Sequence, residues 1–216
     1  MPRTSIFLLC ALALLGCHGT EPPPEPTDAG TKDAGPACAL PFVGDASKAL
    51  EVELIALGPD FKPAPVLDGG ALTLIEPTQG GQVVFVGVRA TNIDPCEVQL
   101  AGALRDPTKA VTIDQRTVNL TPTGDGWAQS NDVATFTNIP ACPNEWSSTT
   151  IYGNPYEVVM TVTDHAKVRT ATITRTVVPA CSEADAGDAV ALCNCICRAG
   201  YVLGEPCDGG SPEAGP

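Results

Sequence analysis

The chain has 216 residues, among them 21 prolines, 21 glycines and ten cysteines, and its formal net charge is −13. Acidic residues are spread along the whole sequence and no basic run or patch occurs, which excludes nucleic acid and an anionic membrane surface as electrostatic partners. Acidity of this kind is sufficient to keep a chain soluble and does not by itself indicate a binding function.

The first sixteen residues have the organisation of a secretory signal peptide. Arg3 supplies a short basic region, and the apolar run over residues 6–15 is too short to span a bilayer. The run ends in Leu14-Leu15-Gly16-Cys17, which resembles a bacterial lipobox. The resemblance implies cleavage before Cys17, a diacylglyceryl thioether on its sulfur and an acylated amine. An ordinary signal peptide that happens to end in cysteine is the alternative.

Acylation determines the expected location. One acyl chain binds a membrane only marginally, whereas two or more hold a protein there stably. His18, and not an aspartate, follows Cys17, which resembles the enteric signal for the outer membrane. We therefore expect a protein that is lipid-anchored in the cell envelope of a Gram-negative bacterium, in its outer membrane.

Residues 18–37, HGTEPPPEPTDAGTKDAGPA, have almost no bulky apolar side chains and cannot bury a core. The proline-rich first half predicts a stiff, extended chain, and the second half, with its repeated Asp-Ala-Gly, predicts a looser one. Twenty residues at the polyproline rise span roughly 60 Å. The segment 17–37 is therefore predicted to be a lipidated stalk that holds a folded part away from the membrane.

Residues 38–181 are the predicted folded domain, and this length is sufficient to bury a hydrophobic core. Short apolar or alternating segments rich in β-branched residues are separated by Gly, Pro and Asp, which predicts strands and no helix between residues 49 and 178. The predicted strands are Ala49–Leu57, Ala71–Ile75, Gln82–Thr91, Cys96–Leu104, Ala110–Leu120, Val133–Thr137, Tyr156–Thr163 and Val168–Val178.

The last two predicted strands and their turn read YEVVMTVTDHAKVRTATITRTVV, over residues 156–178. This string resembles the final hairpin of bacterial immunoglobulin-like and PKD-type domains. The resemblance implies an all-β fold, an immunoglobulin-like Greek-key β-sandwich, with a different β-sandwich or a jelly roll as the alternative. A fold of this kind is compatible with many functions and specifies none of them.

Eight cysteines remain after Cys10 leaves with the signal peptide and Cys17 is lipidated: Cys38, Cys96, Cys142, Cys181, Cys193, Cys195, Cys197 and Cys207. An even number in an exported chain predicts a disulfide framework. Structural zinc sites usually have wider spacing than the alternating cysteines of residues 193–197, so no metal is expected.

The segment Cys195-x-Cys197-x-x-Gly200-Tyr201-x₅-Cys207 resembles the C-terminal half of an EGF-like module. The resemblance implies a disulfide between Cys197 and Cys207. The upstream cysteines of a complete module are missing, so residues 182–216 are expected to be a Cys-rich acidic tail.

The expected topology constrains the remaining cysteines. In a Greek-key sandwich Cys38 and Cys96 lie at one end, which makes a bond between them feasible, and Cys142 and Cys181 lie at the other end. If Cys142 paired with Cys181, the two cysteines left in the tail would have to bond across one residue, which is strained. The two other pairings both attach the tail to the sandwich, and the choice between them stays open.

Catalytic chemistry has few candidates in this sequence. His18 lies in the predicted stalk and His165 in a predicted turn, so no second base is available for a relay. No serine-hydrolase, zinc-protease, phosphate-loop or C-x-x-C redox motif occurs. We therefore expect no enzyme activity, no catalytic residue and no cofactor.

Aromatic residues on predicted loops are candidates for recognition. The loop over residues 140–156 contains Trp146 and Tyr152 among Asn and Ser, and the turn at residues 123–127 presents Trp127. Aromatic faces with adaptable polar neighbours are typical of binding loops. The alternative for all three side chains is that they pack against the core.

Taken together, the sequence predicts a membrane-anchored surface lipoprotein with a non-catalytic binding, adhesion or envelope-structural role. Its partner is expected to be a protein or a polysaccharide. The alternatives are a carbohydrate-binding or enzyme-accessory module, a hydrolase that uses loop carboxylates, and a protease inhibitor that presents a disulfide-pinned loop around Cys142.

Overall fold

A computed structural model of the protein describes residues 38–182 and 187–207. The predicted signal peptide, Cys17 and the predicted stalk lie outside the described residues, as do residues 183–186 and 208–216 of the tail. The described elements are β1 (Glu51–Leu57), β2 (Pro63–Pro65), β3 (Gly70–Leu74), β4 (Gln82–Thr91), β5 (Val98–Arg105), β6 (Val111–Val118), β7 (Thr121–Pro122), β8 (Trp127–Gln129), the 3₁₀ helix η1 (Val133–Thr135), β9 (Thr137–Cys142), β10 (Tyr156–Thr163), β11 (Thr170–Cys181) and α1 (Asp188–Ile196).

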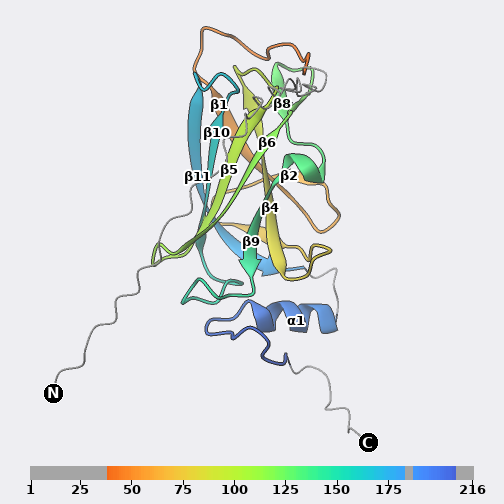
Figure 1. The fold of residues 1–216 in the computed structure, drawn as a ribbon, viewed down its shortest axis with the longest axis vertical. Helices are drawn as coiled ribbons and strands as arrows, with labels where there is room; N and C mark the ends of the chain where they lie inside the picture. The colour runs from red at the N-terminus through yellow and green to blue at the C-terminus, as the bar shows by residue number, and fades with distance from the viewer. Residues whose placement is uncertain (1–37, 183–186, 208–216) are drawn as a thin grey trace, which may run out of the picture. The chain divides into compact units, whose positions relative to one another are not determined.

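The strands form two sheets (Figure 1). One sheet has the order β2-β1-β4-β8-β7, with β9 also paired to β4, and the other has the order β3-β11-β10-β5-β6. The pairing of β3 with β11 is parallel, and the other strand pairs are antiparallel. The predicted β-rich, two-sheet fold with a disulfide-stapled tail is thus confirmed.

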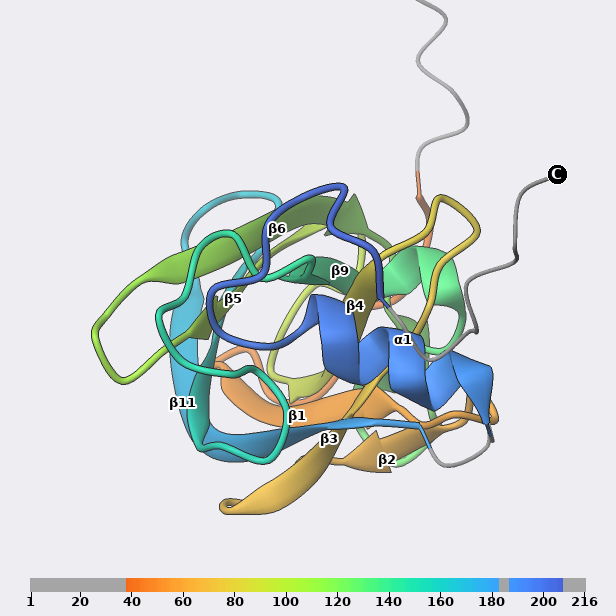
Figure 2. The same ribbon diagram turned by 90° about the horizontal axis from the view of Figure 1, so that it is seen from below.

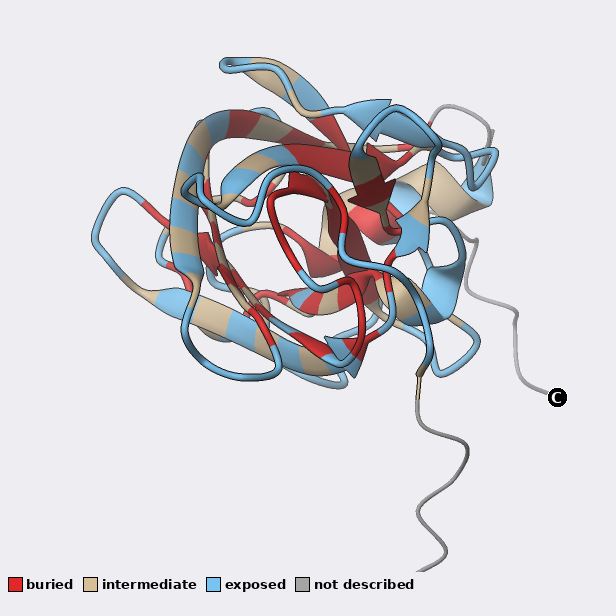
Figure 3. Ribbon diagram, turned by 90° about the horizontal axis from the view of Figure 1, so that it is seen from above, coloured by how far each residue is buried: buried red, intermediate tan, exposed pale blue. Residues whose placement is uncertain are grey.

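The main core lies between the two sheets. Alternate residues of β10 are buried, Tyr156, Val158, Met160 and Val162, and they pack with inward-facing residues of the other strands. Figure 3 shows the buried positions lining the space that the strands enclose, with exposed positions on the loops. Period-two alternation of this kind is expected of strands with one buried face.

A second, smaller core lies on the other face of β1 and β4. It consists of Ile55, Leu57, Ile75, Val83, Phe85 and Phe136. Because β4 is covered on both faces, nine of its ten residues are buried. This burial explains why its sequence, QVVFVGVRAT, is a nearly continuous apolar run and does not alternate.

Side chains close the gap between the sheets where β6 faces β9. The Thr112 hydroxyl donates to the Pro140 carbonyl at 2.7 Å, and Asp114 Oδ2 accepts the Asn138 N–H at 2.7 Å. On the opposite side, a β-bridge between Ile75 and Val83 connects the chain after β3 to β4. Polar backbone groups that would otherwise be exposed at these edges therefore have partners within the domain.

Seven of the eight predicted strands occur, with ends displaced by at most three residues. The predicted strand Val133–Thr137 is wrong, because residues 133–135 form η1 and the strand runs over Thr137–Cys142. The Asp132 side chain accepts the Ala134 N–H at 2.9 Å, and Thr135 Oγ1 accepts the N–H of Asp132 at 3.2 Å. These local bonds close a capping box, which favours a helical turn over a strand.

No helix in the described part of the chain is both long and apolar enough to cross a lipid bilayer.

Candidate functional site

The described residues contain four disulfides, three at the ends of the sandwich and one within the tail. They are Cys38–Cys96, Cys142–Cys197, Cys181–Cys193 and Cys195–Cys207. Figure 2 shows α1 lying across one end of the sandwich, where the second and third of these bonds attach it. The chain from Cys38 joins the sandwich at the opposite end (Figure 1). The tail is therefore fixed at the end that lies farther from residue 38.

The pairing of Cys197 with Cys207 implied by the EGF-like resemblance is wrong. Cys193 lies in α1 and Cys197 is its C-cap, so the two are one helical turn apart and lie on the same side of the helix. Both bond to the sandwich, whereas Cys195 lies between them on another side and bonds to Cys207. The helix, which the sequence analysis did not predict, is the physical reason for the difference.

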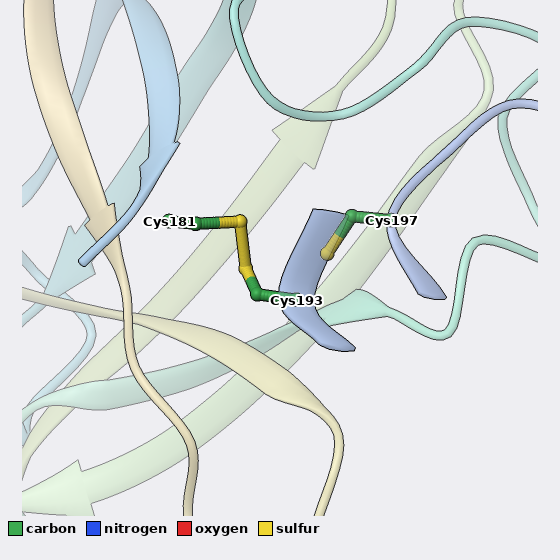
Figure 4. Close-up of side chains that lie close together, drawn as sticks. All are labelled: Cys181, Cys193 and Cys197. Atoms are coloured by element: carbon green, nitrogen blue, oxygen red, sulfur yellow. A yellow bond between two sulfur atoms is a disulfide. The ribbon is translucent and has the colours of Figure 1, made fainter. Parts of the chain in front are cut away.

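The sulfur atoms of three cysteines lie close together beneath α1. Those of Cys181, Cys193 and Cys197 are all within 4.8 Å of one another. Figure 4 shows the Cys181–Cys193 bond with Cys197 beside it. Each sulfur is engaged in a disulfide, and a disulfide sulfur lacks the thiolate charge that binds a metal ion. In this structure the cluster is a pair of adjacent crosslinks.

The loop between β9 and β10 provides hydrogen-bond donors for the end of α1. The N–H of Asn144 donates to the Ile196 carbonyl at 2.8 Å, and the N–H of Ile151 donates to the Cys197 carbonyl at 2.9 Å. The Asn144 side chain donates to the Arg198 carbonyl at 3.2 Å. Carbonyls at a helix C-terminus have no partner within the helix, and here the sandwich supplies them.

The same loop is held by a buried network of polar side chains. Ser147 Oγ donates to Asp106 Oδ2 at 2.8 Å and lies 3.0 Å from the Tyr156 hydroxyl, which donates to the Thr149 carbonyl at 2.9 Å. Asp106 is only 1% exposed and Tyr156 is 1% exposed. Because each hydroxyl has an internal partner, the network fixes the conformation of the loop.

Electrostatics are consistent with this role. Burial of Asp106 acts to raise its pKa. Hydrogen bonds to the carboxylate from Ser147, Thr108 and the Ala110 N–H act in the opposite direction and together outweigh burial, so the pKa of Asp106 lies below its usual value. Burial raises the pKa of Tyr156 above its usual value, which keeps the hydroxyl protonated as a donor. The carboxylate is thus a stable acceptor and the phenol a stable donor near neutral pH.

The candidate aromatic residues do not gather into one surface. Trp146 packs edge-on against Tyr156, with ring centroids 5.9 Å apart, and its Nε1 donates to the Ala141 carbonyl at 2.9 Å. Tyr152, on the same loop, also packs against the main core. Trp127 lies on β8, where the Arg89 guanidinium covers its ring at 4.3 Å. All three side chains thus have intramolecular packing partners.

An aromatic hollow lies instead on the outer face of β4. Its walls include Phe61, Ile75, Phe85 and Val133, with Arg116 and Asn138 among them, and its volume is about 460 Å³. We call it the Phe61–Phe85 hollow. The Phe61 and Phe85 rings are 6.5 Å apart and tilted by 53°. Phe61 is 51% exposed and Val133 is 42% exposed, whereas Phe85 and Ile75 are buried beneath them.

Polar groups meet at one wall of the Phe61–Phe85 hollow. Asn138 of β9 is directly opposite Phe85 of β4, so their side chains lie on the same face of the sheet. Asp114 Oδ2 accepts both the Asn138 N–H at 2.7 Å and Arg116 Nε at 2.8 Å, which places the guanidinium beside Asn138. The Asn138 Oδ1 atom is buried and has no hydrogen-bond partner.

No motif or local pattern in the sequence indicates the residues of this hollow. Phe61 follows a turn that begins at Gly58, Phe85 belongs to an apolar strand, and Arg116 and Asn138 come from two further strands. Phe85, Arg116 and Asn138 meet through the register of β4 with β9 and the side-chain contact between β6 and β9, and Phe61 joins them through its ring contact with Phe85. The one available signal was Phe61, a lone aromatic residue in a segment rich in Pro and Gly.

Comparisons with known proteins do not assign the chain to a family. No protein-family model matches it, and no curated protein is similar to it in sequence. Among solved structures, the CooA pilin subunit from enterotoxigenic Escherichia coli is similar, at 12% identity over 59% of this chain and 97% of that chain, with a TM-score of 0.28. Similarity at this level assigns neither a fold family nor a function. The fold and the site themselves define a disulfide-stapled, two-sheet β protein.

Proposed function

We propose that the protein is an envelope lipoprotein, anchored through Cys17 in the outer membrane, whose folded part is a non-catalytic binding domain. The Phe61–Phe85 hollow carries this proposal, because it combines exposed apolar side chains with the Arg116 guanidinium at its wall. Concave apolar sites with a few convergent polar groups are typical of ligand binding.

The disulfides support export. Four of them join all eight cysteines between residues 38 and 207. Disulfides persist in oxidising compartments such as the periplasm and the cell surface. The apolar run over residues 6–15 and the lipobox-like Leu14-Leu15-Gly16-Cys17 would take the chain there and attach it.

The position of the disulfides also supports display of the domain. A stalk over residues 17–37 would join the sandwich at the end that carries the Cys38–Cys96 bond. The end capped by α1 is the opposite end of the sandwich (Figure 1), so it would lie away from the point where the stalk is attached.

Because Asp106, Ser147 and Tyr156 are engaged with one another, we assign them a structural role and propose no catalysis.

Replacing Cys17 with serine tests the anchor. When the full chain is expressed in a Gram-negative host with labelled palmitate, we expect the wild type to incorporate label and Cys17→Ser to incorporate none, because serine offers no thiol for the thioether. Cys10→Ser is the matched control, since it removes the other cysteine of the signal region and should keep the label. Labelled Cys17→Ser, or an unlabelled wild type, would contradict the proposal.

Capture of a partner through the hollow tests the binding function. Two forms of the full chain, the parent Cys17→Ser and the double variant Cys17→Ser/Phe61→Ala, are immobilised separately. Each is exposed to the same envelope extract of the source bacterium. We expect a retained component that Phe61→Ala reduces about tenfold, because an exposed aromatic anchor of a binding site often contributes 1–2 kcal/mol or more. Phe42→Ala is the control, since Phe42 is 40% exposed but lies under Arg169, outside the hollow. Equal retention by Phe61→Ala and the parent would count against the proposal.

A further inference from the structure

We infer that the reduced form of this protein binds one zinc ion through the four cysteines that attach α1 to the sandwich. They are Cys142, Cys181, Cys193 and Cys197, and we call them the four-sulfur cluster. The inference applies to the chain before these two disulfides form and after a reductant has opened them. It does not depend on the proposed binding function of the Phe61–Phe85 hollow.

The sulfur atoms of the cluster lie close together beneath α1. Those of Cys181, Cys193 and Cys197 are within 4.8 Å of one another (Figure 4). Cys142 is bonded to Cys197, so its sulfur adjoins the same group. In a tetrahedral site each thiolate lies about 2.3 Å from zinc, which places the sulfur atoms about 3.8 Å apart. The four side chains therefore need only small rotations to surround one ion once the two S–S bonds are open.

The spacing of these cysteines also matches a zinc site. Cys193 and Cys197 are separated by three residues and lie on the same side of α1. Structural zinc sites usually contain such pairs, with two to four residues between the ligands. The alternating cysteines of the tail gave the expectation of no metal, but α1 turns Cys195 away and leaves a pair with this wider spacing. The other pair, Cys142 and Cys181, comes from the last residues of β9 and β11.

The surroundings of the cluster favour a closed structural site. Three of its four cysteines are buried and the fourth, Cys181, is half-buried. The N–H of Asn144 donates to the Ile196 carbonyl, and the N–H of Ile151 donates to the Cys197 carbonyl. These bonds hold the end of α1 to the β9–β10 loop without a disulfide, so the ligands stay near one another after reduction. A structural zinc site is of this kind, with four protein ligands and no open position.

The type of ligand selects zinc. The group of close ligand atoms beneath α1 consists of cysteine sulfurs alone. Thiolates are soft ligands that suit zinc, whereas magnesium and calcium require oxygen ligands. Because one zinc ion would bind all four sulfurs, it would connect β9, β11 and α1 as the two disulfides connect them in the oxidised protein.

Conversion between the two forms is a four-electron change, two electrons for each disulfide. A dithiol reductant supplies two electrons and two protons to a disulfide, whose S–S bond breaks to give two thiols while the dithiol closes to a cyclic disulfide. Zinc then binds the four sulfurs as thiolates and displaces their four protons. Oxidation of the thiolates releases the ion and restores the two crosslinks.

Protection of the thiols from alkylation tests the assignment without changing any ligand. The full chain carrying Cys17→Ser is reduced with a phosphine under nitrogen, freed of reductant and treated with one equivalent of zinc. Iodoacetamide and peptide mapping then give the rate at which each cysteine reacts. We expect zinc to slow alkylation of the four-sulfur cluster at least about tenfold, because a metal-bound thiolate is shielded, and to leave the rates of the other cysteines unchanged.

Metal titration of variants assigns the ligands independently. Cobalt(II) is the coloured probe, and we expect one ion per reduced chain, with the intense visible and charge-transfer bands of tetrahedral thiolate ligation. Zinc should displace it with a dissociation constant of about 100 nM or tighter. Cys181→Ser and Cys193→Ser should each weaken zinc binding about 100-fold. The matched control, Cys195→Ser/Cys207→Ser, removes two sulfurs of the tail outside the cluster and should change it less than about twofold.

Circular dichroism of each reduced protein, with and without zinc, keeps the test valid if reduction unfolds the domain. A reduced chain that stays unfolded with one equivalent of zinc would overturn the inference. Protection of the alternating set Cys193, Cys195, Cys197 and Cys207 would overturn it in favour of a site within the tail. Equal weakening by the control variant, or cobalt binding without thiolate bands, would also contradict it.

Discussion

Removing the Cys142–Cys197 disulfide, in the variant Cys142→Ala/Cys197→Ala, is expected to lower the free energy of unfolding by about 4 kcal/mol. The bond closes a sequence separation of 55 residues, and a crosslink over a long loop restricts the unfolded chain most. Both cysteines belong to the main core, at 6% and 0% exposure, so the truncated side chains also leave unfilled space. Urea unfolding of the oxidised protein, extrapolated linearly to water, measures the loss.

The matched control is Cys195→Ala/Cys207→Ala. That bond closes a separation of only 12 residues, and both of its cysteines are partly exposed and belong to the tail. Its removal should cost clearly less, because residues 198–207 contribute to neither sheet. Equal losses in the two variants would contradict the view that Cys142–Cys197 is the principal crosslink between tail and sandwich.

Asp106→Ala is expected to lower the free energy of unfolding by about 3 kcal/mol at neutral pH. The substitution leaves the Ser147 hydroxyl and the Ala110 N–H without the carboxylate that accepts them, in a position that is 1% exposed. It also loosens the loop that supplies donors to α1. Thermal or urea unfolding measures the effect. Asp60→Asn, which removes an exposed pair with Lys62, should leave the midpoint unchanged.

The same carboxylate gives the stability a defined pH dependence. Because hydrogen bonding lowers the pKa of folded Asp106 despite its burial, the unfolded chain takes up a proton at higher pH than the folded one. The stabilisation is therefore complete above about pH 4 and is lost as the pH falls through the lowered pKa of the folded state. Asp106→Asn should lose less stability than the wild type over that acidic window. Parallel curves for the two proteins would exclude Asp106 as the source.

Strands were predictable wherever a repeating pattern determined them. The segment 156–163 alternates, and in the structure its apolar residues face the core at every second position. The nearly continuous apolar run over residues 82–91 predicts a strand, and β4 has these bounds. In both cases the signal is local, because the burial of each residue follows from its own side chain and the period of the strand.

The tail helix and the hollow were not predictable in this way. Residues 188–196, DAVALCNCI, form only nine residues of helix, and a helix this short depends on tertiary contacts, here the disulfides of Cys193 and Cys197. In an extended chain Cys193, Cys195 and Cys197 would all lie on one face, whereas the helix keeps Cys193 and Cys197 on one side and turns Cys195 away from them. The position of Arg116 beside Asn138 depends on two strands from different sheets, which no local pattern encodes.

The closed side between β6 and β9 has a consequence for self-association. A sheet edge with free N–H and C=O groups is a template on which another chain can add a strand and begin a fibre. Here an incoming strand would have to displace Asp114 from the Asn138 N–H and Thr112 from the Pro140 carbonyl. At the outer edge, β2 carries Pro63 and Pro65, which have no N–H to offer. Copies of this domain at high local concentration are therefore protected from polymerising through these strands.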